Sequence, residues 1–150
     1  MNQNRIIAIA NQKGGVGKTT TCVNLAAAFA GMNFPVLLID LDPQGNATTG
    51  CGIDPRRLHM STCEVLLGER SAAETILRPS ELEFDLMPAN GDLTAAEVAL
   101  LQQEGREFAL KRALEPVLEN YAWIFIDCPP SLNMLTLNAL SSADSVLIPV

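Results

Sequence analysis

Short runs of apolar residues recur along the chain and give the first indication of its fold. Residues 6–10 read IIAIA, residues 36–39 read VLLI and residues 123–126 read WIFI. Uninterrupted apolar runs of this length are typical of strands that are buried on both faces of a parallel sheet. The pattern therefore predicts strands over residues 5–11, 36–39 and 123–126.

Segments with a helical distribution of apolar residues separate these strands. The first helix is expected over residues 19–30, because Gly31 stands where glycine often ends a helix. Further helices are expected over residues 94–103, 107–118 and 132–140, and the first of these begins with the capping sequence TAAE. Strands that alternate with helices predict an α/β fold with a mainly parallel sheet and helices on both faces.

Three other segments have weaker patterns. Residues 51–79 are expected to form short helical pieces, one of which begins with the capping sequence SAAE at residues 71–74. Residues 82–87 alternate apolar and acidic side chains, which indicates a strand near an edge of the sheet. Residues 145–150 predict a last strand.

The length and composition favour one globular domain. The chain has 150 residues, of which 48% are hydrophobic and 18% charged, so it is long enough to bury a core. The four cysteines form no CxxC pair, and we expect reduced and mostly buried thiols. The longest apolar run, residues 25–30, is far shorter than the ~20 residues of a membrane-spanning helix. Since no secretory signal is expected either, the cytoplasm is the expected location.

The charge of the chain bears on its possible partners. Ten Lys and Arg residues against 17 Asp and Glu residues give a net charge of -7. Surfaces that bind nucleic acid are normally basic. Any DNA binding is therefore expected to come from outside this stretch of sequence.

A glycine-rich segment joins the first strand to the first helix. Residues 13–20 read KGGVGKTT, and a phosphate-binding loop belongs in this place. Its glycines let backbone N–H groups approach phosphate oxygens, and the following helix adds the positive end of its dipole. A glycine turn that only joins strand to helix is the alternative, but it does not account for the ordered lysine and threonine. Gln12 stands where the common G-x-x-x-x-G-K-[ST] pattern has its first glycine.

The residue types within this loop suggest individual roles. Lys18 would neutralise the β- and γ-phosphates of a nucleotide, and the Thr19 hydroxyl would bind Mg²⁺. Thr20 is placed to reach the α-phosphate. Lys13 is a second cation beside the phosphates, where it would stabilise charge that develops in phosphoryl transfer; a solvated surface lysine is the alternative.

Carboxylates that follow two of the predicted strands complete the candidate site. Asp127 directly follows the apolar run of residues 123–126, as in a Walker B strand, and is predicted to hold Mg²⁺ through water. Capping of the following turn is the alternative role. Asp40 and Asp42 follow the strand over residues 36–39. Because the carboxyl ends of parallel strands meet at one edge of a sheet, these acids are expected near the phosphate loop.

Three motifs together resemble one family. The loop KGGVGKTT, residues 40–46 (DLDPQGN) and residues 126–131 (IDCPPS) are similar to the deviant Walker A motif and the other two motifs of the ParA/MinD group of P-loop ATPases. The resemblance extends over residues 5–150 and favours the ParA/Soj type within that group. It implies a P-loop NTPase fold that binds ATP with Mg²⁺ through Lys13, Gly14, Gly15, Val16, Gly17, Lys18, Thr19 and Thr20.

The resemblance also implies roles for single residues. Lys13 would be the signature lysine, which crosses the interface of a nucleotide-sandwich dimer to contact the partner's phosphates. Asp42 would position the attacking water, and Asp40 would couple its loop to the metal without binding the metal directly. Residues 43–46 would form a segment whose order depends on the γ-phosphate, with an ordinary Pro/Gly turn as the alternative. Lys13, Lys18 and Asp42 are therefore the expected catalytic residues.

The same resemblance implies a function. The protein is expected to hydrolyse ATP to ADP and phosphate as a dimer switch in chromosome or plasmid partitioning. Its expected partners are a second copy on ATP binding, a ParB-type centromere-binding protein and nonspecific DNA, at the nucleoid in the cytoplasm. Residues 42–46 favour this function over a MinD-like ATPase that positions cell division at the membrane, so no membrane partner is expected. A non-catalytic nucleotide-binding module is a third alternative.

The resemblance further bears on domain organisation, because family members continue well beyond the last predicted strand. Residues 1–150 are therefore expected to be the N-terminal part of a single P-loop ATPase domain that is truncated at its C-terminus. The DNA-binding surface and most of the adenine pocket are expected in the remainder. The length is expected to be sufficient for folding but not for function.

Overall fold

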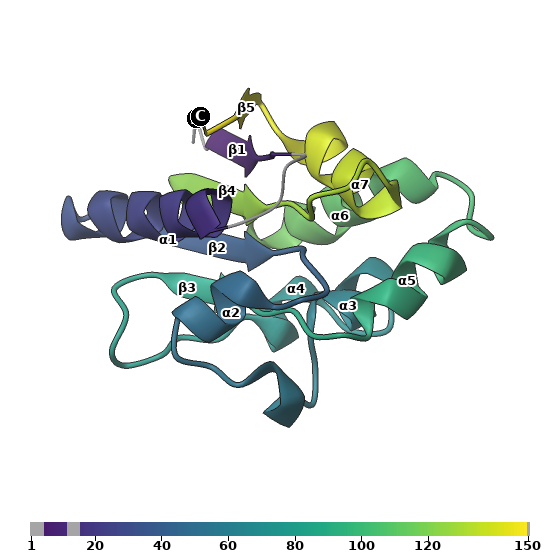
Figure 1. The fold of residues 1–150 in the computed structure, drawn as a ribbon, viewed down its shortest axis with the longest axis horizontal. Helices are drawn as coiled ribbons and strands as arrows, with labels where there is room; N and C mark the ends of the chain where they lie inside the picture. Colours follow the sequence, from purple (N-terminus) through teal and green to yellow (C-terminus); the bar gives the residue numbers. More distant parts are fainter. Residues whose placement is uncertain (1–4, 12–15, 150) are drawn as a thin grey trace.

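Parallel strands form the centre of the computed structural model, which describes residues 5–11 and 16–149 (Figure 1). Within these residues the sheet has five strands in the order β3-β2-β4-β1-β5, and every neighbouring pair is parallel. The predicted α/β fold with a parallel sheet is therefore confirmed. The strands are β1 (Arg5–Ile9), β2 (Val36–Asp40), β3 (Asp85–Met87), β4 (Trp123–Asp127) and β5 (Ser145–Leu147).

Helices connect the strands and cover both faces of the sheet (Figure 1). The α-helices are α1 (Val16–Gly31), α2 (Asn46–Gly50), α3 (Thr62–Leu66), α4 (Ala72–Thr75), α5 (Leu93–Leu100), α6 (Ala109–Leu114) and α7 (Met134–Ser142). Short 3-10 helices are η1 (Pro55–Arg57), η2 (Arg106–Phe108) and η3 (Glu115–Asn120). No helix in the described ranges is long and apolar enough to cross a membrane.

Alternate side chains of the central strands point to opposite faces of the sheet. On β2, Leu37 and Ile39 pack into a core with residues of α3, α5, α6 and α7. Val36 and Leu38 pack on the other face with residues of α1 and α2. Because every residue of β2 is buried, the strand needs apolar side chains on both faces, which explains its uninterrupted apolar run. The four cysteines are buried and free, as predicted.

The helix predicted over residues 107–118 is not continuous. The α-helix α6 covers only the middle of this range and ends at Leu114. The 3-10 helix η2 precedes it and the 3-10 helix η3 follows it. Pro116 explains the change after Leu114, because proline has no N–H to donate and its ring collides with the carbonyl group four residues earlier.

The two predicted capping boxes have different outcomes. Ser71 and Glu74 form a capping box at the start of α4, as predicted. The capping box predicted at Thr94 is wrong, because α5 begins at Leu93. The amide of Thr94 donates to the carbonyl oxygen of Gly91 at 3.1 Å, so the turn before α5 supplies an acceptor for the first amides of the helix. Thr94 therefore lies inside the helix and not at its N-cap.

Element ends also differ from the predictions in other places. Helix α1 begins three residues earlier than expected, whereas α7 begins at Met134 because the Asn133 side chain accepts hydrogen bonds from the amides of Leu135 and Thr136. The strand predicted over residues 82–87 is reduced to β3, which does lie at an edge of the sheet. At the other edge β5 ends at Leu147, shortly before Pro149, whose missing N–H cannot join the sheet.

Replacing Phe125 by alanine is expected to lower the free energy of unfolding by about 3–5 kcal/mol, because it leaves a cavity in the core. Phe125 is fully buried on β4, and its ring centroid lies 5.5 Å from that of Phe29. Urea unfolding measures the loss. Phe108→Ala is the control, because this ring is 43% exposed and should account for about 1 kcal/mol or less. Equal losses in both variants would contradict the described core.

Candidate active site

The predicted site residues meet where three strands end at the same level. In the parallel ladders Ile9 of β1 and Asp40 of β2 are both register partners of Asp127 at the end of β4. Helix α1 begins shortly after β1, so its first turn lies beside these strand ends. Its first turn contains no acidic residue, and the N–H groups at a helix N-terminus suit an anion.

A buried ion pair lies at the centre of the site. The Lys18 ammonium donates to Oδ1 of Asp127, and these residues are 2% and 0% exposed. The Thr19 hydroxyl donates to Oδ2 of Asp127 at 3.1 Å, so both carboxylate oxygens have a donor. Burial raises the pKa of Asp127, and the positive charge of Lys18 opposes that rise. The pair therefore joins the start of α1 to the end of β4.

Asp40 lies one strand away and makes contacts with the loop that follows it. Its Oδ1 accepts a hydrogen bond from the amide of Asp42 at 3.1 Å. Its Oδ2 accepts from the amide of Thr48 at 2.9 Å and from the Thr48 hydroxyl at 2.7 Å. Burial raises the pKa of Asp40 to about 7, and the charge of Asp127 adds to the rise. These contacts orient residues 42–48 relative to β2.

Asp42 lies in a tight turn that its own side chain stabilises. Asp42 is 3% exposed, and its Oδ1 accepts a hydrogen bond from the amide of Gln44 at 3.0 Å. Its carbonyl oxygen accepts from the amide of Gly45 at 2.8 Å. Gly45 has a φ of 66°, and a Cβ there would lie 2.9 Å from Pro55 and 3.1 Å from the carbonyl oxygen of Ala89. Only glycine fits at this point of the loop without strain.

The structure brings together most of the predicted site residues that it describes. Lys18, Thr19 and Asp127 are in direct contact, and Asp40 and Asp42 lie at the end of the neighbouring strand. Gly17 and Thr20 lie in the first turns of α1 and are exposed. Val16 begins α1, and its side chain is not described; Lys13, Gly14 and Gly15 lie outside the described residues.

Sequence reasoning missed Thr48 and Ala89. Thr48 lies on α2 and is fully buried, and its hydroxyl accepts a hydrogen bond from the amide of Ala89 at 2.9 Å. A threonine eight residues after Asp40 and a backbone amide beyond β3 form no recognisable motif. Their role comes from the fold, which places the ends of β2 and β3 side by side.

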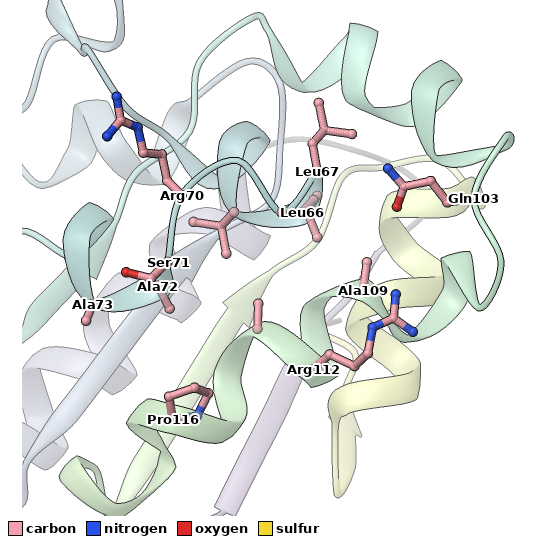
Figure 2. Close-up of a pocket in the computed structure, with 13 residues that line it drawn as sticks. Leu66, Leu67, Arg70, Ser71, Ala72, Ala73, Gln103, Ala109, Arg112 and Pro116 are labelled. Atoms are coloured by element: carbon pink, nitrogen blue, oxygen red, sulfur yellow. The ribbon is translucent and has the colours of Figure 1, made fainter.

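A pocket on another part of the molecule contains none of these residues (Figure 2). It has a volume of about 310 Å³ and lies where α3, α4 and α6 meet. Leu66, Ala72 and Ala109 line it with apolar groups, and around it lie the side chains of Arg70, from the loop between α3 and α4, and Arg112, from α6 (Figure 2). Arg70 pairs with Glu74 at 3.6 Å. None of the residues that line the pocket belongs to the strand-end site.

Comparison with known proteins places the chain in a family. A family model described as an AAA domain matches residues 4–150. The chain belongs to this family, and the resemblance to ParA/Soj-type P-loop ATPases that its motifs suggested is confirmed.

Individual relatives agree with this assignment. The chain is 54% identical over 147 residues to the chromosome partitioning protein ParA of Myxococcus xanthus, and 50% identical over 146 residues to the sporulation initiation inhibitor protein Soj of Bacillus subtilis. Each alignment covers 97% of this chain, and they cover 52% and 58% of the respective relatives. The chain thus spans about half the length of these curated relatives.

A solved structure supports the fold. The chain is 48% identical to a cobyrinic acid a,c-diamide synthase from Mycobacterium smegmatis, whose crystal structure contains an ATP analogue and magnesium. The match covers 99% of this chain and 60% of that chain, with a TM-score of 0.96. The predicted P-loop NTPase fold is confirmed.

Asp40 is expected to make the protein less stable as the pH rises in the absence of nucleotide. The unfolded chain releases this proton near 3.8, whereas the folded protein holds it up to about 7. Between these values the folded state binds more protons, so the free energy of unfolding falls with increasing pH, by up to about 1.4 kcal/mol per pH unit. Asp40→Asn should reduce this slope in urea unfolding between pH 5 and 7.

The control for this experiment is Asp54→Asn. Asp54 is paired with Arg56, which lowers the pKa of Asp54, so this acid titrates below the chosen pH range. Its variant should keep the slope of the original protein. An unchanged slope in Asp40→Asn would show that Asp40 titrates normally in the folded state.

Proposed function

We propose that this protein is a Mg²⁺-dependent ATPase that acts as an ATP-driven dimer switch in chromosome or plasmid partitioning. The observation that carries the proposal is the buried contact of Lys18 and Thr19 with Asp127 at the start of α1. This arrangement puts a cation, a hydroxyl group and a carboxylate beside a helix N-terminus, which is the set of groups that a nucleoside triphosphate with its metal requires.

The Lys18 ammonium is the group that would bind the β- and γ-phosphates. It is held by a single described carboxylate, and phosphate oxygens can replace that carboxylate as its hydrogen-bond acceptors. Backbone amides at the start of α1 would add neutral donors. The full set of residues proposed to contact the nucleotide is Lys13, Gly14, Gly15, Val16, Gly17, Lys18, Thr19 and Thr20.

The Thr19 hydroxyl and the Asp127 carboxylate fit a magnesium site. Their oxygens lie 3.1 Å apart, and Mg²⁺ prefers oxygen ligands that it shares with substrate phosphates. Thr19 would bind the ion directly and Asp127 through water. Asp40 would act indirectly, because its hydrogen bonds go to Asp42 and Thr48. When bound, the ion would neutralise charge on the phosphates.

Asp42 is the residue proposed to orient the attacking water. Its place on a tight turn beside the strand ends supports this role, because the turn holds the carboxylate close to the groups that would bind phosphate. Lys13 would add positive charge from the partner protomer of the dimer. Residues 43–46 would form a segment whose conformational order depends on whether a γ-phosphate is bound.

The named relatives support the proposed partners. Because the relatives include ParA and Soj, we propose a homodimer that forms on ATP binding, a ParB-type protein that stimulates hydrolysis, and nonspecific DNA as the surface on which the dimer acts. The part of the longer relatives that this chain does not match would supply the DNA-binding surface. The proposed location is the nucleoid in the cytoplasm.

Nucleotide binding tests this function. In the protein encoded by the complete gene, Lys18→Ala should weaken binding of a fluorescent ATP analogue with Mg²⁺ by at least about 100-fold, because it removes the charge-assisted bonds to phosphate. Lys111→Ala is the matched control, since Lys111 is exposed on α6 and should be dispensable. Thr19→Ala keeps the ion pair of Lys18 with Asp127 but removes the proposed magnesium ligand. Its affinity for the analogue should therefore fall to the affinity that the original protein shows in EDTA. Normal binding by Lys18→Ala would overturn the proposal.

Asp42→Asn should separate binding from turnover. The amide oxygen can still accept from the Gln44 amide, so the loop is expected to keep its shape and ATP affinity should stay within about three-fold. Loss of the charge that orients water should slow hydrolysis by about 100-fold or more in an assay that contains only ATP and Mg²⁺ besides the protein. Asp92→Asn is the control, because Asp92 is exposed and its side chain makes no cap hydrogen bond. Undiminished hydrolysis in Asp42→Asn would assign the water to another residue.

A further inference from the structure

The Thr48 hydroxyl lies at a point where three separate segments meet. Thr48 belongs to α2, Asp40 ends β2, and Ala89 follows β3. The hydroxyl donates to Oδ2 of Asp40 at 2.7 Å and accepts from the amide of Ala89 at 2.9 Å. All three residues are fully buried. One hydroxyl group therefore uses both its donor and an acceptor position away from water.

Asp40 carries this connection to the residue proposed to orient water. While Oδ2 of Asp40 contacts Thr48, Oδ1 accepts a hydrogen bond from the backbone amide of Asp42 at 3.1 Å. The orientation of the Asp40 carboxylate thus depends on the donors at Thr48, and the backbone of Asp42 follows that orientation. Only two hydrogen bonds separate the Thr48 hydroxyl from the Asp42 amide.

Ala89 restrains the same loop from its other side. Its amide donates to Thr48, and its carbonyl oxygen lies so close to Gly45 that a Cβ on Gly45 would be 3.1 Å away. The turn of residues 42–45 is therefore enclosed between Asp40 and the segment after β3. A displacement of Ala89 would remove restraints on both ends of this turn.

We propose that Thr48 is a positioning residue for ATP hydrolysis. Its hydroxyl fixes Asp40 and Ala89 relative to each other, and so fixes the position of Asp42 relative to the phosphate-binding half of the site. This inference rests on the proposed function, but it assigns Thr48 to the turnover step alone. Lys18 and Thr19 lie on α1, which Thr48 does not hold through any of its described hydrogen bonds, so nucleotide affinity should be independent of the Thr48 hydroxyl.

The shape of the side chain and its hydroxyl can be separated by substitution. Thr48→Val keeps the volume and branching of threonine but leaves the buried Ala89 amide without its acceptor. Thr48→Ser removes a methyl group and keeps the hydroxyl. The neighbouring Thr49→Val makes the same chemical change at an exposed position of α2 and is the matched control.

The experiment measures kcat and KM for ATP in the protein encoded by the complete gene. Thr48→Val should lower kcat about ten-fold or more, because small displacements of a catalytic group have large effects on rate. Its KM and its affinity for a fluorescent ATP analogue should stay within about two-fold. Thr48→Ser and Thr49→Val should keep kcat within about two- to three-fold of the original protein.

Hydrogen exchange provides a readout besides activity. Without nucleotide, the Ala89 amide should exchange faster in Thr48→Val than in Thr48→Ser, since only the serine variant retains its acceptor. If Thr48→Val does not fold, Thr48→Cys takes its place with the same expectations, because a thiol is a weak donor and acceptor.

Three results would overturn the inference. The first is an unchanged kcat in the valine variant, and the second is a serine variant that loses as much kcat as valine. The third is a valine variant in which kcat falls and ATP binding weakens by the same factor, which would mean that Thr48 has a general structural role. Failure of the proposed function is distinguishable, because it would appear as normal ATP binding in Lys18→Ala or as no hydrolysis in the original protein.

Discussion

The burial of one ammonium group and three acidic side chains at the strand ends is the constraint on which this site depends. Lys18, Asp40, Asp42 and Asp127 are each at most 3% exposed. Removing such charges from water is unfavourable by several kcal/mol per ion unless each has hydrogen-bond partners. Asp127 meets this requirement with Lys18 and Thr19, whereas Asp40 and Asp42 meet it largely with backbone amides. The local backbone is therefore shaped by the need to supply donors to buried acids.

This requirement divides the site into two halves. One half consists of α1 and β4, which are joined by the contact between Lys18 and Asp127 and lie on the central strands of the sheet. The other half is the turn of residues 42–46, which is held by side chains from β2 and α2. Lys18, which would bind phosphate, thus lies on a helix that packs on the central strands, and Asp42, which would act on water, lies on a turn with separate supports. Such a division allows binding and turnover to be changed independently.

The sequence was sufficient to predict the features that depend on local pattern. Strands β1, β2 and β4 were recognisable because burial on both faces demands uninterrupted apolar runs, and Lys18 and Thr19 were recognisable from their spacing after glycines. Asp127 could be placed near them because parallel strands end at one edge. Features that depend on tertiary contacts were not recognisable. The start of α5 is set by a preceding turn, and the role of Thr48 arises only where β2 and β3 lie side by side.

Within the described residues β5 lies at an edge of the sheet, and this has a consequence for the behaviour of the 150-residue chain in solution. It pairs with β1 along one side, and Val146, Leu147 and Ile148 are 47%, 39% and 65% exposed. Unpaired strand edges with apolar side chains act as templates on which other strands assemble, and natural proteins usually cover or charge them. Association through β5 would depend on protein concentration. Measurements of oligomeric state on this chain must therefore vary concentration and nucleotide separately, so that pairing through an edge is not mistaken for a nucleotide-driven dimer.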